Sequence, residues 1–367
     1  MIEKIIIAHL YNPGSAATNR ILAYASGYKH LGNSVSLVFG CEGGINAPNL
    51  DDIEVVEVKS QTHRGLSKRM ARVIKSLYDP SRTAIQIYGT PELCLYLPKS
   101  CYNIFYECTE VPFYGEKASL PSRLKEVLRL WLIKRSTGMM VISRALKDYY
   151  SDRGIKNIEI VNMFVDANRF QVDECKRKDE YIAYCGKVSL HKDGVDTLIR
   201  AYSVFRKNHS SVKLWIIGGF ESKETEKQVR GLSKELNLDR DVRFLGAVAP
   251  SEMPALLCDA KILALARPNN IQAKYGFPTK LGEYLATGKP VVVTNVGEIG
   301  VFLEDGVNCR IAEPDNYRDF ADKLSWVMDN YELALHIGAK GRELTQNAFS
   351  CVEQCKVALS FMNHCIC

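Results

Sequence analysis

Short apolar runs alternate with amphipathic stretches along the whole chain. The run Lys4–His9 is followed by Thr18–Leu31, whose apolar residues recur at the spacing of one helical face, and then by the run Val35–Phe39. Apolar runs separated by helices are typical of parallel sheets that are covered on both faces, so the pattern predicts a Rossmann-like unit here. The further strands predicted in the first half are Ile53–Val58, Thr83–Tyr88, Asn103–Tyr106, Gly138–Ile142 and Ile158–Val161.

A polar and strongly charged segment, Asp166–Lys178, interrupts this pattern and indicates an exposed hinge. The strand pattern then restarts, and the predicted strands are Tyr181–Cys185, Lys213–Ile217, Val242–Phe244, Ile262–Leu265, Val291–Val293 and Cys309–Ile311. The helices between them are predicted to begin near Val195, Glu224, Ser251, Thr279 and Asn316. We predict an α/β protein of two Rossmann-like, doubly wound parallel-sheet domains, 1–170 and 171–350, that face each other across a cleft. A final helix, Cys351–Met362, is expected to pack back onto the first domain, so that 351–367 joins it.

The composition of the 367 residues, 46% hydrophobic and 25% charged, excludes a disordered, collagenous or membrane-spanning chain. The N-terminal segment Met1–Leu10 has neither the basic start and apolar run of a signal peptide nor the length of a spanning helix. We therefore expect a cytoplasmic protein. The twelve cysteines are scattered without a CxxC pair, which favours core thiols over a disulfide framework.

The net charge of +6 lies in the first half of the chain, because residues 1–170 hold 22 basic and 16 acidic side chains while residues 171–367 hold 26 of each. Two stretches concentrate it, residues 64–75 and Lys117–Arg135. In the second stretch five apolar residues share one helical face: Leu124, Val127, Leu128, Trp131 and Leu132. This face either packs into its own domain or lies on an anionic membrane surface. Nucleic acid is not an expected partner, since interleaved aromatic residues and a domain pI above about 9 are not evident.

The first βα loop contains neither a GxGxxG fingerprint nor a P-loop. Gly14 and the small residues after it still let a backbone approach a ligand at a helix N-terminus, although a tight turn without a ligand is the alternative. His9, at the end of the first strand, is a candidate acceptor-site residue.

Two lysines follow the first strand of the second half. Gly186 and Lys187 end this strand, and Lys192 precedes the next helix. Two cations at the carboxyl end of a strand can neutralise a diphosphate and stabilise a leaving group that develops negative charge. Isolated lysines are usually surface residues, and the adjacent glycine is what favours a site.

A second candidate site lies at residues 276–290. Thr279 is a plausible N-cap after Pro278, and the helix N-terminus that it starts offers free N–H groups to an anion. Glu283 lies one turn inside, where a carboxylate can accept two hydrogen bonds from a ribose diol; alternatively it only caps the helix dipole. Gly288 is predicted to end the helix.

Taken together, these segments resemble the family 4 retaining glycosyltransferases, which have the GT-B fold, over nearly the whole chain. The matching stretches are Val141–Ser143, Asp148–Tyr150, Gly154–Ile155, Val161–Phe170, Gly186–Lys187, Lys192–Ala201, Leu214–Gly219, Val242–Gly246 and Phe277–Pro290, the last similar to the variant FPxKLxEYxAxGxP. The resemblance implies transfer of a sugar from a nucleoside diphosphate sugar, held mainly by the second domain, to an acceptor held by the first.

The resemblance also assigns donor-site roles. Lys187, in place of the family's usual Arg, and Lys192 would hold the diphosphate, Glu283 would bind the ribose, and the backbone near Gly246–Val248 would meet the base. Eight residues before Glu283, where the family has a glutamate that contacts the sugar, this chain has Tyr275. The choice of sugar and the level of activity therefore stay open. The other residues expected to line the donor site are Gly14, Gly186, Gly276, Phe277, Pro278 and Thr279.

In the first domain the resemblance points to the end of the fifth strand. Thr109 stands where the family often has a histidine that faces the sugar, and Glu107 and Glu110 are the nearby carboxylates. One of them could orient or deprotonate the acceptor hydroxyl, or both could be ordinary acids at the edge of the cleft. A retaining enzyme of this kind would use front-side displacement, in which the donor phosphate accepts the proton.

We therefore expect a hexosyltransferase-type glycosyltransferase that transfers a sugar, with retention, to a glycan or lipid-linked acceptor in polysaccharide or glycolipid biosynthesis. No metal or other cofactor is expected; Asp239-Arg240-Asp241 is a literal DxD, but it lies in a helix-to-strand turn. The enzyme would be cytoplasmic or peripheral at the inner face of the membrane. The alternatives are a non-catalytic GT-B partner subunit and a GT-B sugar-nucleotide epimerase.

Overall fold

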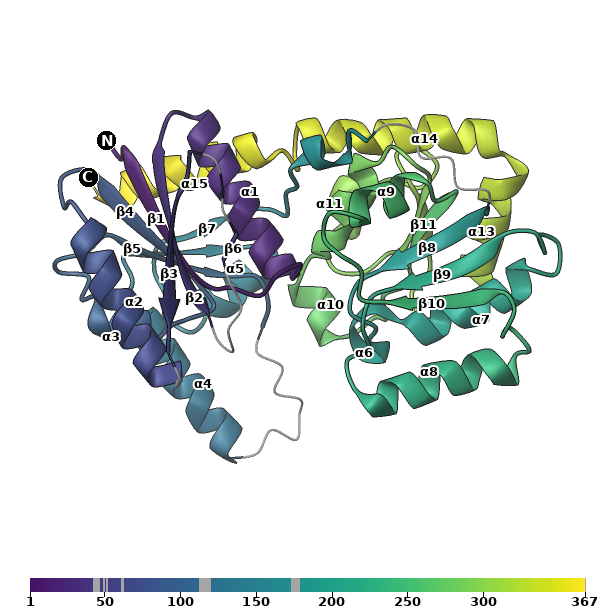
Figure 1. Cartoon of the computed structure of the whole chain (residues 1–367), viewed down its shortest axis with the longest axis horizontal. Helices are drawn as coiled ribbons and strands as arrows, with labels where there is room; N and C mark the ends of the chain where they lie inside the picture. The colour runs from purple at the N-terminus through teal and green to yellow at the C-terminus, as the bar shows by residue number, and fades with distance from the viewer. Residues whose placement is uncertain are drawn as a thin grey trace. The chain divides into compact units, whose positions relative to one another are not determined.

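The computed structural model describes residues 1–41, 47–48, 50, 52–60, 63–111, 120–172 and 179–366 (Figure 1). The chain divides into two compact units: the first comprises Met1–Phe164 and Cys351–Cys367, and the second comprises Val165–Ser350. The division precedes the charged segment in which the sequence predicted a hinge. Val165 belongs to the second unit because its amide donates to the Phe349 carbonyl (3.1 Å) and its backbone forms a bridge with Ser350.

The first unit is built on a sheet of parallel strands in the order β3-β2-β1-β4-β5-β6-β7. The strands are β1 (Lys4–Leu10), β2 (Ser34–Cys41), β3 (Glu54–Lys59), β4 (Thr83–Tyr88), β5 (Ile104–Cys108), β6 (Gly138–Val141) and β7 (Ile158–Ile160). Ile5, Ile6 and Ile7 of β1 are all fully buried, as expected for a strand covered on both faces.

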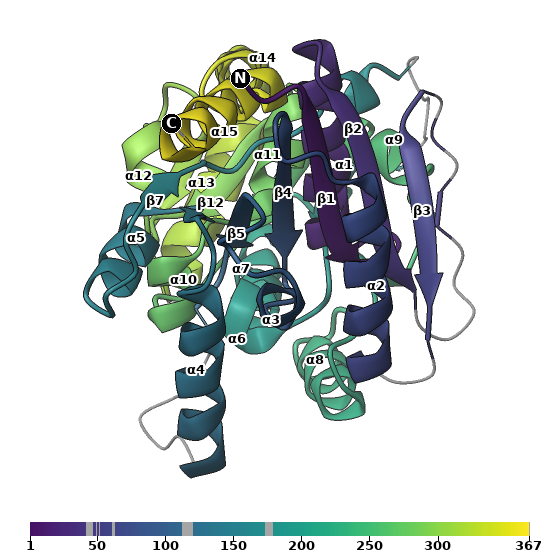
Figure 2. The ribbon, with the colours of Figure 1, turned by 90° about the vertical axis from the view of Figure 1, so that its left-hand side faces the viewer.

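The helices of the first unit are α1 (Ala16–His30), α2 (His63–Leu77), α3 (Leu93–Tyr96), α4 (Leu120–Ile133), α5 (Arg144–Ser151) and α15 (Cys351–Ile366). Ser15 caps α1, since its side chain accepts from the Thr18 amide. Helix α15 packs against α1 and contributes Cys355, Ala358 and Phe361 to the same core cluster. On the surface shown in Figure 2, α3 lies between α2 and α4 and contacts both.

The second unit repeats the plan with a parallel sheet in the order β10-β9-β8-β11-β12-β13. The strands are β8 (Tyr181–Cys185), β9 (Lys213–Ile217), β10 (Val242–Gly246), β11 (Ile262–Leu265), β12 (Val291–Thr294) and β13 (Arg310–Ala312). The helices are η1 (Ala167–Phe170), α6 (Leu190–Asp193), α7 (Val195–Phe205), α8 (Lys223–Glu235), α9 (Met253–Cys258), α10 (Ile271–Tyr275), α11 (Thr279–Ala286), α12 (Ile299–Phe302), α13 (Tyr317–Asp329), α14 (Tyr331–Glu343) and η2 (Leu344–Gln346).

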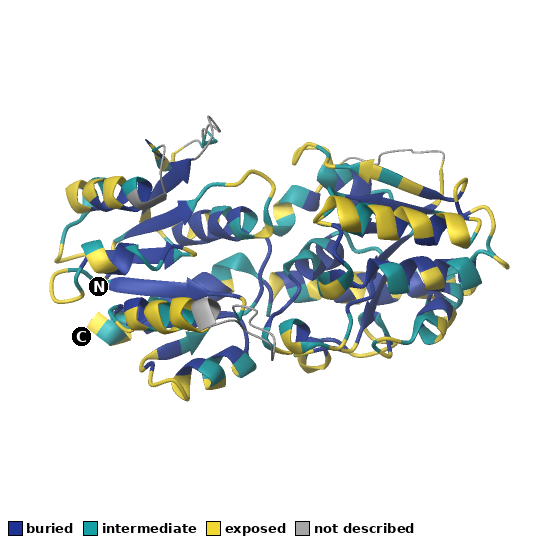
Figure 3. Ribbon diagram, turned by 90° about the horizontal axis from the view of Figure 1, so that it is seen from below, coloured by how far each residue is buried: buried dark blue, intermediate teal, exposed yellow. Residues whose placement is uncertain are grey.

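The prediction of two doubly wound parallel sheets is confirmed, and each predicted strand is present with its bounds shifted by two residues or fewer. Figure 3 shows most of the strand residues buried and the outer faces of the helices exposed. The ten cysteines within the described residues are free thiols, and most are buried. Within those residues, no helix is both long enough and apolar enough to cross a membrane.

Candidate functional site

The centre of the second sheet is a topological switch point. The chain leaves β8 towards β9 on one side and leaves β11 towards β12 on the other. In open parallel sheets of this kind, ligands bind outside the carboxyl ends of the strands at such a point. Gly186 follows β8 here, and its φ of +149° is a conformation that favours glycine.

The turn after β8 is packed closely against its neighbour. The Gly186 amide donates to the Ile217 carbonyl at 2.8 Å. A Cβ atom on Gly218 would lie 2.0 Å from the Gly186 carbonyl oxygen, so only glycine fits at position 218. The contact between the Gly186 and Gly218 backbones therefore fixes the turn that carries Lys187 and precedes Lys192.

Lys187 is exposed on this turn, and Lys192 is half-buried in the short helix α6. Ser189 caps α6 by accepting from the Lys192 amide at 3.2 Å, and Arg267 donates from Nε to the Lys192 carbonyl at 3.1 Å. Arg267, directly after β11 and only 2% exposed, was not singled out from the sequence. Gly186, Lys187 and Lys192 thus lie on the segment that follows β8, and the buried guanidinium of Arg267 lies beside Lys192. Their binding of a diphosphate stays a prediction.

Helix α11 is anchored to β8 by Tyr284, whose hydroxyl accepts from the Cys185 amide (2.7 Å) and lies 3.3 Å from the Cys185 carbonyl oxygen. The prediction that Thr279 is the N-cap is wrong by one residue: Pro278 occupies that position, and Thr279 is the first helical residue. Gly288, with φ of +71°, follows the end of the helix as predicted.

Glu283 lies on α11, and its side chain is 15% exposed. Its Oε1 accepts from Arg169 of η1 at 3.2 Å. The ribose-binding role of Glu283 stays a prediction, and Arg169 is the residue that orients it.

The loop between α10 and α11 carries the residues expected around the sugar. Tyr275 ends α10 and is half-buried, and Gly276 is extended and buried. The Phe277 ring is 6% exposed and packs against Phe302 and Phe349, with ring centroids 5.8 and 5.6 Å away. The Phe277 side chain is therefore part of the core, and a donor-site role for this residue stays a prediction.

The residues expected to meet the base follow β10. Gly246 has φ of +69°, and its carbonyl accepts from the Gly218 amide at 2.8 Å. Val248 is half-buried two residues later. The hydrogen bond from Gly218 links this segment to the turn after β8, because Gly218 also lies against Gly186.

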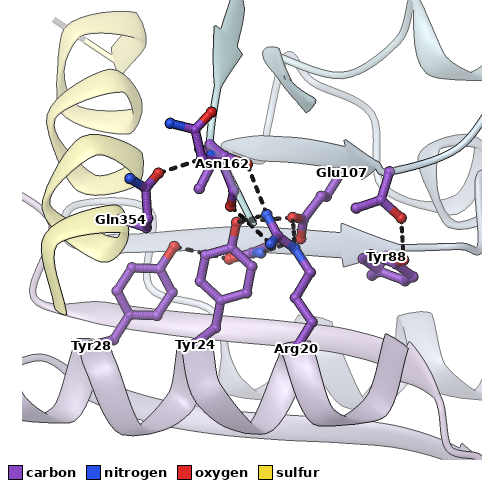
Figure 4. A network of polar contacts seen from close by, with 10 residues as sticks. Arg20, Tyr24, Tyr28, Tyr88, Glu107, Asn162 and Gln354 are labelled. Atoms are coloured by element: carbon purple, nitrogen blue, oxygen red, sulfur yellow. Dashed lines mark hydrogen bonds and ion pairs between the residues drawn. The ribbon is translucent and has the colours of Figure 1, made fainter. Parts of the chain in front are cut away.

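A group of buried charges in the first unit corrects the sequence prediction for Glu107. The sequence placed the end of the strand at Tyr106 and Glu107 beyond it, towards the acceptor; this is wrong, because β5 continues to Cys108 and Glu107 is 1% exposed inside it. Its carboxylate accepts from Arg20 Nε (2.7 Å), the Tyr24 hydroxyl (2.9 Å) and Gln86 Nε2 (2.9 Å). Figure 4 shows Arg20 and Tyr24 directed towards Glu107. A carboxylate held in this way is not accessible to an acceptor hydroxyl, so we assign Glu107 a structural role.

Arg20 extends this network to the segment that follows β7. Its guanidinium donates to the Val161 carbonyl (2.9 Å) and to the Asn162 carbonyl (3.0 Å). The Asn162 amide in turn donates to Gln354 of α15 at 2.8 Å (Figure 4). Helix α1, strand β5, residues 161–162 and α15 are thus joined through one buried ion pair.

His9, Tyr88 and Thr109 converge at the switch point of the first sheet, where β1 and β4 are neighbours. The His9 ring lies 5.3 Å from the Tyr88 ring, and the Tyr88 and Thr109 hydroxyl oxygens are 2.6 Å apart. His9 Nε2 lies 3.2 Å from the Thr18 hydroxyl, and burial lowers the pKa of His9 to about 4. Tyr88 was not selected from the sequence, although its place at the end of a buried strand could have identified it.

The remaining predicted residues of the first unit lie apart from this group. Gly14 is in the exposed turn before α1, with φ of +71°. Glu110 is exposed beyond the end of β5, and its carbonyl accepts from the Cys108 thiol at 3.0 Å. Of the two carboxylates proposed from the sequence, only Glu110 is therefore exposed.

Asp241, the second aspartate of the DxD sequence, is also engaged. Its carboxylate pairs with Lys213 and Arg206, each at 2.6 Å, at the amino end of the second sheet. Within the part of the chain that the structure describes, no three His, Cys, Asp or Glu side chains are grouped so as to hold a metal ion.

Comparison with known proteins identifies the second unit. Residues 166–344 match the model of the family described as "Glycosyl transferases group 1". D-inositol 3-phosphate glycosyltransferase of Corynebacterium aurimucosum is 27% identical over 160 residues, which are 43% of this chain and 37% of that protein. Poly(ribitol-phosphate) alpha-N-acetylglucosaminyltransferase of Staphylococcus aureus is 23% identical over 193 residues, which are 52% of this chain and 37% of that protein. The chain thus aligns with well under half the length of these relatives.

Solved structures show the same fold over both units. Anabaena HepE, determined in complex with UDP and glucose, has a TM-score of 0.74 and 17% sequence identity, and the match covers 99% of this chain and 100% of that one. Sucrose-phosphate synthase of Thermosynechococcus elongatus has a TM-score of 0.77 and 12% identity, with 99% and 98% covered. These likenesses show the GT-B fold. The match to the glycosyl transferases group 1 model thus lies within the second unit, and the likeness to solved structures extends the GT-B fold to both units.

Proposed function

We propose that this protein transfers a sugar from a nucleoside diphosphate sugar to an acceptor hydroxyl, and that the donor binds at the switch point of the second sheet. The observation that carries the proposal is the placement of Lys187, Lys192 and buried Arg267 around the glycine turn after β8. The names of the relatives support the activity, and the UDP and glucose bound to the HepE structure support the donor class.

The residues of the second unit have separate roles in this proposal. Lys187 and Lys192 neutralise the diphosphate, whose negative charge grows as it leaves the sugar. Glu283, oriented by Arg169, accepts from the ribose hydroxyls, and the backbone of Gly276 and Phe277 contacts the sugar. We propose that these lysines make a metal ion unnecessary, so that activity survives an excess of EDTA.

We further propose that the transfer retains the configuration of the sugar. The bond between the anomeric carbon and the phosphate oxygen breaks, and the acceptor oxygen forms its bond on the same face. The leaving phosphate accepts the proton of the acceptor hydroxyl, so no protein base is needed. This assignment agrees with the burial of Glu107, and it leaves Glu110 and the group of His9, Tyr88 and Thr109 to orient the acceptor.

The donor site is tested by calorimetry with UDP, GDP and ADP. We expect the native protein to bind one of them, Lys192→Ala to lose at least tenfold in affinity for it, and Glu283→Gln to bind it several-fold more weakly. A native protein that binds none of the three would contradict the proposal. Hydrolysis of a panel of sugar nucleotides without acceptor then separates an enzyme from a non-catalytic subunit with the same fold, in which Tyr275 in place of a glutamate would have abolished turnover.

We also propose that the acceptor is lipid-linked and that α4 docks the enzyme on an anionic membrane surface. The sequence left open whether the apolar face of α4 is buried. Leu132 is 5% exposed, but the other four residues are not buried: Leu124 (62% exposed), Val127 (64%), Leu128 (56%) and Trp131 (49%). Their spacing places them in one stripe that points away from the packed side.

Positive charge borders this stripe, as binding to anionic lipid requires. Arg123, Lys125 and Lys134 are exposed, and the Arg135 guanidinium lies 4.9 Å from the centre of the Trp131 ring. Residues 117–119 of the predicted basic stretch lie outside the described residues. On the same surface, α2 has the exposed cations Lys68, Arg69, Arg72 and Lys75. Helix α3, which contacts both α2 and α4, has a Leu95 side chain that is 47% exposed.

Co-sedimentation with vesicles tests the docking. We expect binding to vesicles that contain phosphatidylglycerol, release by salt, and no binding to pure phosphatidylcholine. The triple variant Leu124→Ser, Val127→Ser, Trp131→Ser should stay in the supernatant. The matched control Val301→Ser, Leu333→Ser removes apolar side chains that are 72% and 54% exposed in the second unit and should bind as the native protein does. Equal binding by both variants would exclude α4 as the docking element.

A further inference from the structure

The cation packed most closely against the Gly186 turn is Lys280, the second residue of α11. A Cβ atom on Gly186 would lie 2.5 Å from Lys280 Nζ. The ammonium is held by two acceptors, Asp193 Oδ2 at 2.5 Å and the Tyr184 hydroxyl at 3.3 Å. Glycine at position 186 thus does two things: it adopts φ of +149°, and it leaves room for the ammonium beside the turn.

The ion pair with Asp193 holds the Lys280 ammonium in place. The Asp193 side chain is 3% exposed and the Lys280 side chain 17%. Burial opposes ionisation of Asp193, but the charge and hydrogen bond of Lys280, the Arg267 charge and the Tyr184 hydrogen bond together hold the pKa of that carboxyl below its usual range. An ammonium has three N–H donors, and Asp193 and Tyr184 accept two of them. The third is available to a ligand on the exposed side.

The charge around this ammonium is positive overall. The charge of Arg267 also acts on Asp193, so one buried carboxylate is shared by two cations. Lys192, next to Asp193 in the chain, adds a further positive charge at the same turn. A net positive charge in a partly buried position favours an incoming anion more strongly than the same charge in water.

We propose that Lys280 donates its third N–H to the diphosphate of the donor and that Asp193 is the residue that positions it. This inference rests on the donor site proposed above and adds a cation that the assignment of Lys187 and Lys192 does not include. Lys280 is pre-organised by its two acceptors, whereas Lys187 is exposed. A lysine held in place loses less side-chain entropy on binding than a mobile one.

Affinity for a nucleoside diphosphate and for its parent nucleoside, measured by calorimetry, tests the proposal. The probe is whichever of UDP, GDP and ADP the native protein binds. We expect Lys280→Gln to bind the diphosphate at least tenfold more weakly and to bind the nucleoside with unchanged affinity. Lys213→Gln is the matched control, since Lys213 pairs with Asp241 at 2.6 Å, with side chains 29% and 8% exposed, at the opposite end of the same sheet.

Lys280→Gln alone leaves the buried Asp193 carboxylate without this counter-ion and could misfold for that reason. The double variant Asp193→Asn, Lys280→Gln is the control, because it removes both charges of the ion pair. We expect it to keep a cooperative thermal transition and the same loss of diphosphate affinity. The proposal is overturned if either variant binds the diphosphate as tightly as Lys213→Gln does. A native protein that binds none of the three diphosphates would instead overturn the donor site itself, so the two failures are distinguishable.

Discussion

At the scale of single residues, the charges buried in the first unit serve stability and not chemistry. Arg20 and Glu107 have side chains that are 2% and 1% exposed and are joined at 2.7 Å. Taking both charges out of water costs several kcal/mol per ion, which their attraction offsets only when the remaining hydrogen-bonding positions are filled. Here Tyr24, Gln86 and two backbone carbonyls fill them.

Replacing Glu107 by glutamine should therefore be costly, because it leaves the Arg20 charge buried without a counter-ion. We expect the free energy of unfolding to fall by about 3–5 kcal/mol. The control Glu226→Gln breaks an exposed i,i+4 pair with Arg230 and should cost about 0.5 kcal/mol or less. Urea unfolding of both variants measures the difference, and similar losses would contradict the structural role of Glu107.

His9 should make the stability of the protein depend on pH. Burial lowers its pKa from 6.5 to about 4, so between these values the unfolded chain binds a proton that the folded chain does not. This stabilisation is fully present above pH 6.5 and is lost as the pH falls towards 4, by about 3 kcal/mol in all.

Unfolding free energies measured from pH 7 to pH 4 check this expectation. In His9→Asn this part of the pH dependence should disappear, whereas His336→Asn, which replaces an exposed histidine, should keep it. If His9→Asn shows the same slope as the native protein, the pH dependence comes from another group.

The roles of single residues were the least predictable from the sequence. Glu107 was mistaken for an edge-loop acid because its partner, Arg20, lies 87 residues away in the chain. The ammonium of Lys280 could not be placed beside Gly186 from spacing, since 94 positions separate them. By contrast, Gly186 and Gly288 were identified correctly, because a glycine at the end of a strand or helix reflects a local backbone requirement.

At the scale of elements, most strands were predictable because they are apolar runs buried on both faces, a local property of the sequence. In α4 the structure divides the single apolar face that the sequence predicted: Leu132 packs inward while Trp131 does not. Periodicity identifies an amphipathic helix but cannot show which apolar side meets the core.

The contact between α1 and α15 gives a prediction at this scale. A Cβ atom on Gly27 of α1 would lie 2.5 Å from the Cys355 sulfur and 2.9 Å from the Cys351 carbonyl oxygen of α15. We expect Gly27→Ala to reduce the free energy of unfolding by about 1–3 kcal/mol, because the two helices must separate.

Gly231→Ala in α8 is the matched control. A Cβ atom there meets nothing within 4 Å, so the substitution should stabilise the protein by about 0.5–1 kcal/mol through the higher helix propensity of alanine. Chemical denaturation of both variants should give shifts of opposite sign, and a stabilising Gly27→Ala would refute the close packing of α1 on α15.

At the scale of the whole molecule, the alternation of strands and helices was sufficient to predict two doubly wound sheets. It could not locate the division of the chain, because the hydrogen bond from Val165 to Phe349 joins residues from both ends of the second unit. Likewise the sequence could name the residues at the carboxyl end of β8, but only the strand order shows that the end of β11, which Arg267 follows, is its neighbour.

Removal of residues 351–367 tests how the first unit is completed. The deletion exposes the core face of α1 and removes Phe361, whose ring lies 5.8 Å from that of Phe105. We expect amide hydrogen exchange in β1, β5 and α1 to lose protection, while β8 and β11 stay protected. Full protection of β1 in the truncated chain would show that α15 is dispensable for this core.

The polypeptide that forms the first unit is interrupted by the second, since its last helix comes after Ser350. During synthesis, the first unit therefore keeps part of its apolar surface uncovered until residues 351–367 have been made. Residues 165–350 can already fold by then. The backbone bridge between Val165 and Ser350 places the first and last residues of the second unit side by side. Slow synthesis of residues 351–367 should thus leave the first unit incompletely folded for longer, although most of its residues are made first.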